Sequence, residues 1–167
     1  DMDGVLADFF KGFANHFGKD HWKQIQNKEK SIQELQGTDF FNTLDMFPTT
    51  TELVNFVQTL VGDDWGICSS PLRGDRDNSA YWKRRWLERN GYVPPLIENM
   101  IFTGNKHKYA WNKLTRQPNI LIDDRPDNVA FEVYDDEKLD TESLFGGLSV
   151  YDRVTSIQDK IDKVLYN

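Results

Sequence analysis

Three short apolar stretches of this chain each end directly in polar side chains. They are Trp65–Ser69, Asn99–Thr103 and Asn119–Ile122, and the last runs straight into Asp123. Short apolar runs bounded by turn residues are typical of buried strands. Segments with helical spacing of apolar residues separate them, and strands that alternate with helices indicate a parallel sheet covered on both faces. The sequence therefore predicts an α/β fold.

The helices are predicted from apolar residues that recur every three or four positions. They cover Leu6–Phe17, part of Asp20–Gln36, Thr49–Val61 with Thr49 or Thr50 as cap, Asp77–Asn90 closed by Gly91, and His107–Leu114. A last strand at Gly147–Tyr151 and a helix at Ser156–Tyr166 complete the order. We expect Asp20–Gln36 to cover the core without joining it, and Lys83 to face water while Trp86 faces the sheet.

The stretch between Leu6 and Gly62 is too long for a simple crossover between two strands, so part of it is interpreted as a small cap. A chain of 167 residues fits one compact domain. We therefore expect a single domain, residues 1–167, with a core of residues 1–8 and 62–167 and a helical cap of approximately residues 9–61.

The chain opens with two carboxylates two positions apart, Asp1 and Asp3, followed at once by Gly4. If this stretch ends a strand, alternation points both acids to one side, and Gly4 lets the chain turn away. Ligands of parallel sheets bind outside the carboxyl ends of the strands. Asp1 and Asp3, Ser69, Lys106 and the Asp123–Asp124 pair should therefore converge at one edge.

Composition restricts the class of function. A net charge of −7 argues against a partner that is polymeric nucleic acid, and no apolar run is long enough to cross a membrane. Cys68 is the single cysteine and cannot form an internal disulfide, which fits a reducing cytoplasm, the expected location. The chain begins without Met, and we expect a strand to lead into Asp1.

The predicted group of side chains suits the hydrolysis of phosphate monoesters. One carboxylate can attack phosphorus while a cation offsets the charge of the phosphate oxygens. A hydroxyl and a lysine can hold the remaining oxygens, and a second carboxylic acid can protonate the leaving oxygen and then activate water. The sequence offers a candidate for each of these roles.

The same residues resemble a known family. Asp1–Val5, Ser69, Lys106 and Asp123–Asp124 follow the order of the four motifs of haloacid dehalogenase (HAD) superfamily phosphatases. The stretches DMDGVLADF, ICSSP and LIDDRPDN further resemble the 5′(3′)-deoxyribonucleotidases. The resemblance implies a Rossmann-like core with a helical cap inserted after the first motif. It also implies Mg²⁺ and the dephosphorylation of nucleoside monophosphates through an aspartyl-phosphate.

The resemblance assigns catalytic roles by position. Asp1 corresponds to the nucleophile and a metal ligand, and Asp3 to the acid/base, which also binds the metal through its backbone carbonyl. Ser69 stands where the family usually has threonine, and it keeps the hydroxyl. Lys106 matches the lysine that steadies the nucleophile and phosphate. Its distance along the chain to the Asp pair is longer than in relatives, which leaves Lys108 and Lys113 as alternatives.

Further residues are assigned to the metal and the substrate. Asp124 completes the metal ligands, and Asp123 supports it directly or through water. Ser70 is a further phosphate contact, and Phe9 matches an aromatic residue that packs on the base. Other candidates for base, phosphate or ribose contacts are Trp22, Phe40, Phe41 and Arg125.

Two alternative functions remain open at this point. One is a phosphatase of the same superfamily that acts on sugar phosphates or another small phosphometabolite. The other is a phospho-accepting receiver or a silent Mg²⁺-binding domain, since receivers also gather acids, a hydroxyl and a lysine at a sheet edge. The preferred base, the 5′ or 3′ position of the phosphate and the assembly state, with a homodimer among the options, stay open.

Overall fold

The computed structural model describes residues 1–113 and 115–125. Its sheet contains two parallel strands, β1 (Ile67–Ser69) and β2 (Met100–Phe102), with Ile67 paired to Met100. Helix α4 (Arg76–Asn90) and the 3₁₀ turn η3 (Ile97–Asn99) connect them. This β–α–β unit confirms two predicted strands and an α/β fold with a small parallel sheet. The strand and helix expected within residues 147–166 lie outside the described residues.

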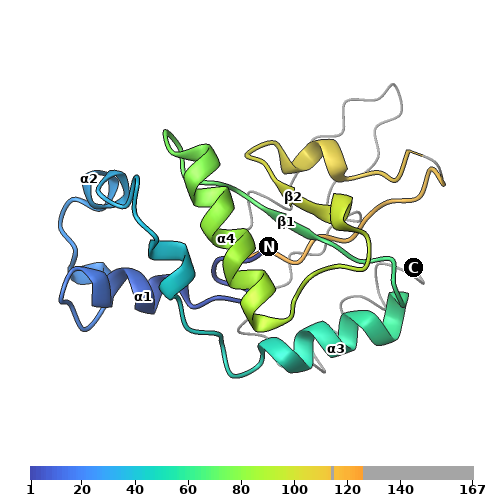
Figure 1. Cartoon of the computed structure of the whole chain (residues 1–167), viewed down its shortest axis with the longest axis horizontal. Coiled ribbons are helices and arrows are strands. Elements are labelled where there is room, and N and C mark those ends of the chain that lie inside the picture. Colours follow the sequence, from blue (N-terminus) through green and yellow to red (C-terminus); the bar gives the residue numbers. More distant parts are fainter. Residues whose placement is uncertain (114, 126–167) are drawn as a thin grey trace.

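The remaining described elements come mostly before the sheet in the chain. They are α1 (Phe9–His16), η1 (Trp22–Gln24), α2 (Lys28–Gln33), η2 (Phe40–Thr43), α3 (Thr50–Val61) and, after β2, η4 (Lys106–Tyr109). In Figure 1, α1 and α2 lie on one side of α4, away from the strands, whereas α3 runs below the strands. No described helix is both long and apolar enough to span a lipid bilayer.

The first helix begins later than predicted. The Met2 carbonyl accepts hydrogen bonds from the backbone N–H groups of three later residues, Val5, Leu6 and Ala7, so the chain makes a tight turn there. The Asp8 carboxylate then caps α1 by accepting from the Lys11 N–H at 3.1 Å. Helix α1 therefore starts at Phe9 and not at Leu6.

The predicted threonine cap of α3 is confirmed in position but not in its hydrogen bond. Thr49 occupies the cap position, but its side chain makes no cap hydrogen bond. The hydroxyl of Thr50 instead donates to the Leu6 carbonyl at 2.7 Å, and Thr50 is fully buried. The hydroxyl thus fixes α3 to the turn after Asp3, a contact that only the tertiary structure provides.

Two predictions after β2 are also wrong. The expected helix His107–Leu114 is reduced to the single turn η4, because Trp111 pairs with Pro118 in an antiparallel bridge that turns the chain back. The expected strand Asn119–Ile122 is not a strand among the described residues. Its backbone is held instead by single hydrogen bonds, from the Asn119 N–H to Ala110 and from the Asp1 backbone nitrogen to Ile122.

The core lies between α4, the turn after Asp3 and the segment before α3. Trp86 and Leu87 of α4 are fully buried, as predicted for Trp86. Lys83 is also fully buried, so the expectation that it faces water is wrong. Ile25 and Leu35 are buried too, so the stretch 20–36 contributes to the core, contrary to the prediction. The buried residues of α4, which include Lys83, Trp86 and Leu87, fix the orientation of this helix relative to β1.

Replacing Trp86 by phenylalanine is expected to lower the free energy of unfolding by about 2–4 kcal/mol. The indole Nε1 donates to the buried Leu44 carbonyl at 2.7 Å, and the smaller ring would leave both a cavity and an unpaired carbonyl. Denaturant unfolding measures the change. Trp82→Phe is the control, because Trp82 is only partly buried against the same core. Equal losses in the two variants would contradict the explanation.

Candidate active site

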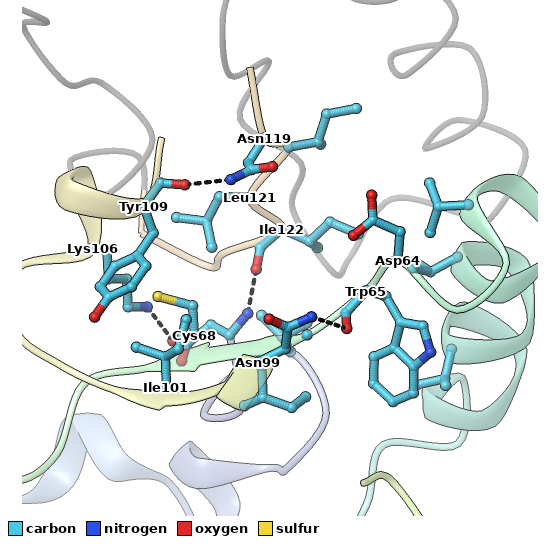
Figure 2. Close-up of a pocket in the computed structure, with 18 of the residues that line it drawn as sticks. Asp64, Trp65, Cys68, Asn99, Ile101, Lys106, Tyr109, Asn119, Leu121 and Ile122 are labelled. Atoms are coloured by element: carbon cyan, nitrogen blue, oxygen red, sulfur yellow. Dashed lines mark hydrogen bonds and ion pairs between the residues drawn. The ribbon is translucent and has the colours of Figure 1, made fainter. Parts of the chain in front are cut away.

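The structure brings the predicted residues into two adjoining groups. Ser69 ends β1, and Lys106 begins η4 shortly after β2. The Asp1 backbone nitrogen donates to the Ile122 carbonyl at 2.6 Å, which joins the start of the chain to the residues just before Asp123 (Figure 2). Each group therefore assembles segments that are distant in the sequence, as expected for the carboxyl edge of a parallel sheet.

Lys106 lies in the first group, between two carboxylates. Its Nζ is 3.2 Å from Asp1 Oδ2 and 2.5 Å from Asp123 Oδ2, and the three side chains are almost completely buried. Buried charges require partners of opposite sign, and here one cation offsets part of the charge of two acids. Lys108 and Lys113, the alternatives to Lys106, are both exposed.

Asp124 adds a third acid to this group. Carboxylate oxygens of Asp1, Asp123 and Asp124 lie within 4.8 Å of one another. Burial, and then the neighbouring Asp123 charge, raise the pKa of the Asp124 carboxyl above its usual value. Oxygen ligands at this spacing suit a hard divalent cation, which would offset the repulsion between the acids. The donor set therefore fits the predicted Mg²⁺.

Gly4 allows the close approach of Asp124. Its φ of +74° lies in the left-handed region, which confirms the turn predicted here. A Cβ atom at this position would lie 2.5 Å from Asp124 Oδ2. Both the backbone conformation and the space thus require glycine next to the acidic group.

Gly4→Ala is expected to reduce both stability and affinity for divalent cations. Left-handed backbone costs a residue with a Cβ about 1–2 kcal/mol, and the contact with Asp124 adds to this. Gly91→Ala is a matched control, because Gly91 has a φ of +79° and open space around its would-be Cβ. Calorimetric titration with Mg²⁺ should show weaker binding for Gly4→Ala and unchanged binding for Gly91→Ala. Equal affinities would refute the role of the contact.

The second group contains Asp3, Ser69 and a residue that the sequence analysis missed, Lys83. The Lys83 Nζ donates to Asp3 Oδ2 at 2.6 Å, to Ser69 Oγ at 3.1 Å and to the Ser70 carbonyl at 2.6 Å. Burial lowers the pKa of Lys83, while the Asp3 charge opposes this. The spacing of Ser79, Lys83 and Trp86 on α4 is the signal that could have placed Lys83 on the buried face.

The proposed substrate residues lie mainly in an aromatic cluster. Phe9 is partly exposed and stacks on Phe13 at a centroid distance of 5.5 Å, whereas Phe40 and Phe41 are almost fully buried behind it. Trp22 packs on Phe10, 5.1 Å away, at the edge of this cluster. Two of the four aromatic candidates, Phe9 and Trp22, are therefore accessible to a ligand as the structure stands.

The other two candidate substrate contacts, Arg125 and Ser70, lie near the carboxylates of the two groups. The Arg125 backbone N–H donates to Asp123 Oδ1 at 2.9 Å, and its side chain is exposed. Ser70 is partly buried, and its carbonyl accepts from Lys83. The backbone of each residue is therefore tied to one of the two groups.

A cavity of about 520 Å³ adjoins the first group. Asp1 and Lys106 line one part of it, and Figure 2 shows Cys68 and Ile101 on one side, with Leu121 and Ile122 across from them. The lining elsewhere is mainly apolar. The acidic group therefore borders a hollow and is not enclosed in close-packed core.

The sequence is similar to proteins named 5′(3′)-deoxyribonucleotidase. It is 30% identical to the mitochondrial enzyme of Mus musculus over 153 residues, 79% of this chain and 66% of that protein. The human mitochondrial enzyme is also 30% identical, over 79% of this chain and 63% of its own length. The chain thus spans slightly less than two thirds of each mitochondrial relative.

A bacterial relative is covered more fully. A Bordetella pertussis protein that carries the same name as a provisional assignment is 31% identical over 144 residues, 75% of this chain and 72% of that protein. A scan against models of known protein families finds no match.

Proposed function

The chain belongs to the 5′(3′)-deoxyribonucleotidase family, and from this membership we propose that it hydrolyses deoxyribonucleoside or ribonucleoside monophosphates to nucleoside and phosphate. The observation that carries the proposal is the meeting of Asp1, Lys106, Asp123 and Asp124 beside a second group of Asp3, Ser69 and Lys83. These side chains supply a nucleophile, a proton donor, a hydroxyl and cations within one region.

In the first step, an Asp1 carboxylate oxygen attacks phosphorus and the bond from phosphorus to the ribose oxygen breaks. The Asp3 carboxylic acid gives its proton to that leaving oxygen, so the nucleoside departs neutral. Lys106 lies 3.2 Å from Asp1 Oδ2 and keeps the nucleophile in place. The product is an aspartyl-phosphate on Asp1.

In the second step, Asp3, now a carboxylate, takes a proton from water as the water oxygen attacks phosphorus. The bond from phosphorus to Asp1 breaks, which releases phosphate and restores both carboxyl groups. The hydroxyl of Ser69 donates to a phosphate oxygen in both steps. Asp1, Asp124, the backbone carbonyl of Asp3 and, directly or through water, Asp123 would hold Mg²⁺, which supplies charge neutralisation for the phosphate oxygens when bound.

The proposed architecture is a HAD core with an inserted cap. Residues 1–8 and 62–167 would form the core, and approximately residues 9–61 the insert. Helices α1 and α2 lie away from the strands in Figure 1, so the part of the insert before α3 would be the part that covers the substrate. Phe9 and Trp22 would contact the base, with Phe40 and Phe41 packed behind Phe9. Ser70 and Arg125 would contact phosphate or ribose.

The test is phosphate release from a panel of deoxyribonucleoside monophosphates, ribonucleoside monophosphates and sugar phosphates. We expect Mg²⁺-dependent turnover of deoxyribonucleoside monophosphates, since the relatives carry the name of deoxyribonucleotidases. Release from sugar phosphates alone would overturn the proposed substrate. An aspartyl-phosphate that persists for minutes without turnover would overturn the enzymatic function in favour of a receiver.

A further inference from the structure

Lys83 is a fully buried lysine with an unusually complete set of acceptors. All three N–H bonds of its ammonium group have a partner: Asp3 Oδ2, Ser69 Oγ and the Ser70 carbonyl. An ammonium has three donors and no acceptor, so none remains for a further ligand. Lys83 therefore cannot bind a phosphate oxygen without losing one of these contacts. A surface lysine, whose donors are bonded to water, can bind an anion without such a loss.

Each acid of the first motif has its own lysine. Asp1 is paired with Lys106 and Asp3 with Lys83. The two lysines come from different elements, η4 and α4, so the carboxylates are oriented independently. A buried charge pair with short hydrogen bonds restricts the side chains to one arrangement. Lys83 thus fixes the direction in which the Asp3 carboxylate points.

The second carboxylate oxygen of Asp3 accepts no hydrogen bond from the described residues. Asp3 Oδ1 is buried and has no hydrogen-bond partner among the described residues. An unpaired buried oxygen costs about 1–3 kcal/mol, so folded proteins seldom keep one without a reason. Lys83 holds Oδ2, so Oδ1 is the Asp3 oxygen left to a partner outside the described residues, such as the leaving oxygen of a bound substrate.

The lysine is also shielded from the side of the insert. The ring of Phe41, from η2, lies 4.7 Å from Lys83 Nζ in a cation–π contact. Phe41 in turn stacks on Phe9 at a centroid distance of 6.3 Å. The aromatic cluster therefore excludes water from Lys83 and connects the proposed base contact, Phe9, to the acid/base residue through two side chains.

We propose that Lys83 is a positioning residue for the reaction: it holds Asp3 Oδ2 and the Ser69 hydroxyl so that Asp3 Oδ1 faces the leaving oxygen of the substrate. This inference rests on the proposed function and adds a residue to it. Lys83 acts through Asp3 and does not touch the substrate.

The test compares two leaving groups in Lys83→Met, which keeps the length of the side chain and removes its charge. A nucleoside leaves as an alkoxide that needs a proton, whereas the nitrophenolate of p-nitrophenyl phosphate leaves without one. If Lys83 positions the proton donor, the single-turnover rate of leaving-group release, which reports the first step alone, should fall about 10²–10³-fold for thymidylate and less than about tenfold for p-nitrophenyl phosphate. Lys19→Met, at an exposed lysine outside both groups, is the control and should match the wild type.

An equal fall for both substrates would overturn the proposal, because a merely structural defect does not distinguish leaving groups. Unchanged single-turnover rates would overturn it as well. If Lys83→Met does not fold, Lys83→Met combined with Asp3→Asn removes both charges of the pair. The double variant should then have the same activity as Asp3→Asn alone, and a further loss would contradict an action through Asp3.

A structural measurement separates this inference from the proposed function. Wild-type protein that hydrolyses neither substrate would overturn the function. A crystal structure of Lys83→Met, or of the double variant, would still show whether residue 3 leaves its place beside Ser69. A side chain at residue 3 that stays where it is would overturn the positioning role, and a displaced one would support it.

Discussion

Asp1→Asn is expected to lower phosphate release from nucleoside monophosphates by about 10⁴-fold or more. The amide is a poor nucleophile and cannot form the aspartyl-phosphate. The fold should persist, because Lys106 keeps its shorter contact with Asp123 and remains paired. Steady-state assays with thymidylate measure the loss, and thermal unfolding checks that the protein is intact.

The matched control for this substitution is Asp45→Asn. Asp45 is exposed and forms an ion pair with Lys11, at 3.1 Å on the surface, where such pairs contribute little. The chemical change is the same, and the activity should match that of the wild type. Turnover by Asp1→Asn within tenfold of the wild type, with an intact fold, would rule out Asp1 as the nucleophile.

Removal of divalent cations is expected to reduce turnover at least about 10³-fold, and added Mg²⁺ should restore it. Carboxylates of Asp1, Asp123 and Asp124 gather within 4.8 Å, and Lys106 offsets the charge of two of them, Asp1 and Asp123. Without a cation, these carboxylates would repel the negatively charged phosphate of the substrate. Assays with EDTA, followed by titration with Mg²⁺, measure the effect, and full activity in EDTA would exclude a metal-dependent reaction.

Asp124→Asn is expected to weaken Mg²⁺ binding and, at neutral pH, to stabilise the metal-free protein. Because the pKa of Asp124 is raised in the folded protein, its stabilising contribution is present below the unfolded pKa and is lost as pH rises through the folded pKa. At neutral pH the metal-free variant should therefore unfold at a higher temperature than the metal-free wild type, while binding Mg²⁺ more weakly. Lower stability of the variant at neutral pH would refute this account.

The meeting of Asp1, Lys106 and Asp123 was predictable because the carboxyl ends of parallel strands share an edge, whatever the details of the strands. The prediction survived even though Asn119–Ile122 forms no strand among the described residues. Among the described residues, single backbone hydrogen bonds join the two ends of that segment to Ala110 and Asp1, and apolar periodicity carries no information about these.

The burial of Lys83 beside Asp3 was not predicted, for a different reason. Helix α4 carries several basic residues, and the usual cost of burying a lysine places such residues in water. Here the cost is offset by Asp3, which lies 80 positions away in the sequence. In the same way, the helix expected after Lys106 was a local inference that the contact of Trp111 with Pro118 overrides. A partner far along the chain thus placed Lys83, whereas a bridge to a nearby residue ended the helix after Lys106.

The hydrogen bond between the Asp1 backbone nitrogen and Ile122 also has a consequence for folding. It joins residues 121 positions apart. Closing so long a loop costs about 4 kcal/mol of chain entropy, more than one hydrogen bond returns. The acidic group can thus assemble only after the core between its ends has packed. Cation binding should therefore report global folding, and be lost together with the cooperative unfolding transition and not before it.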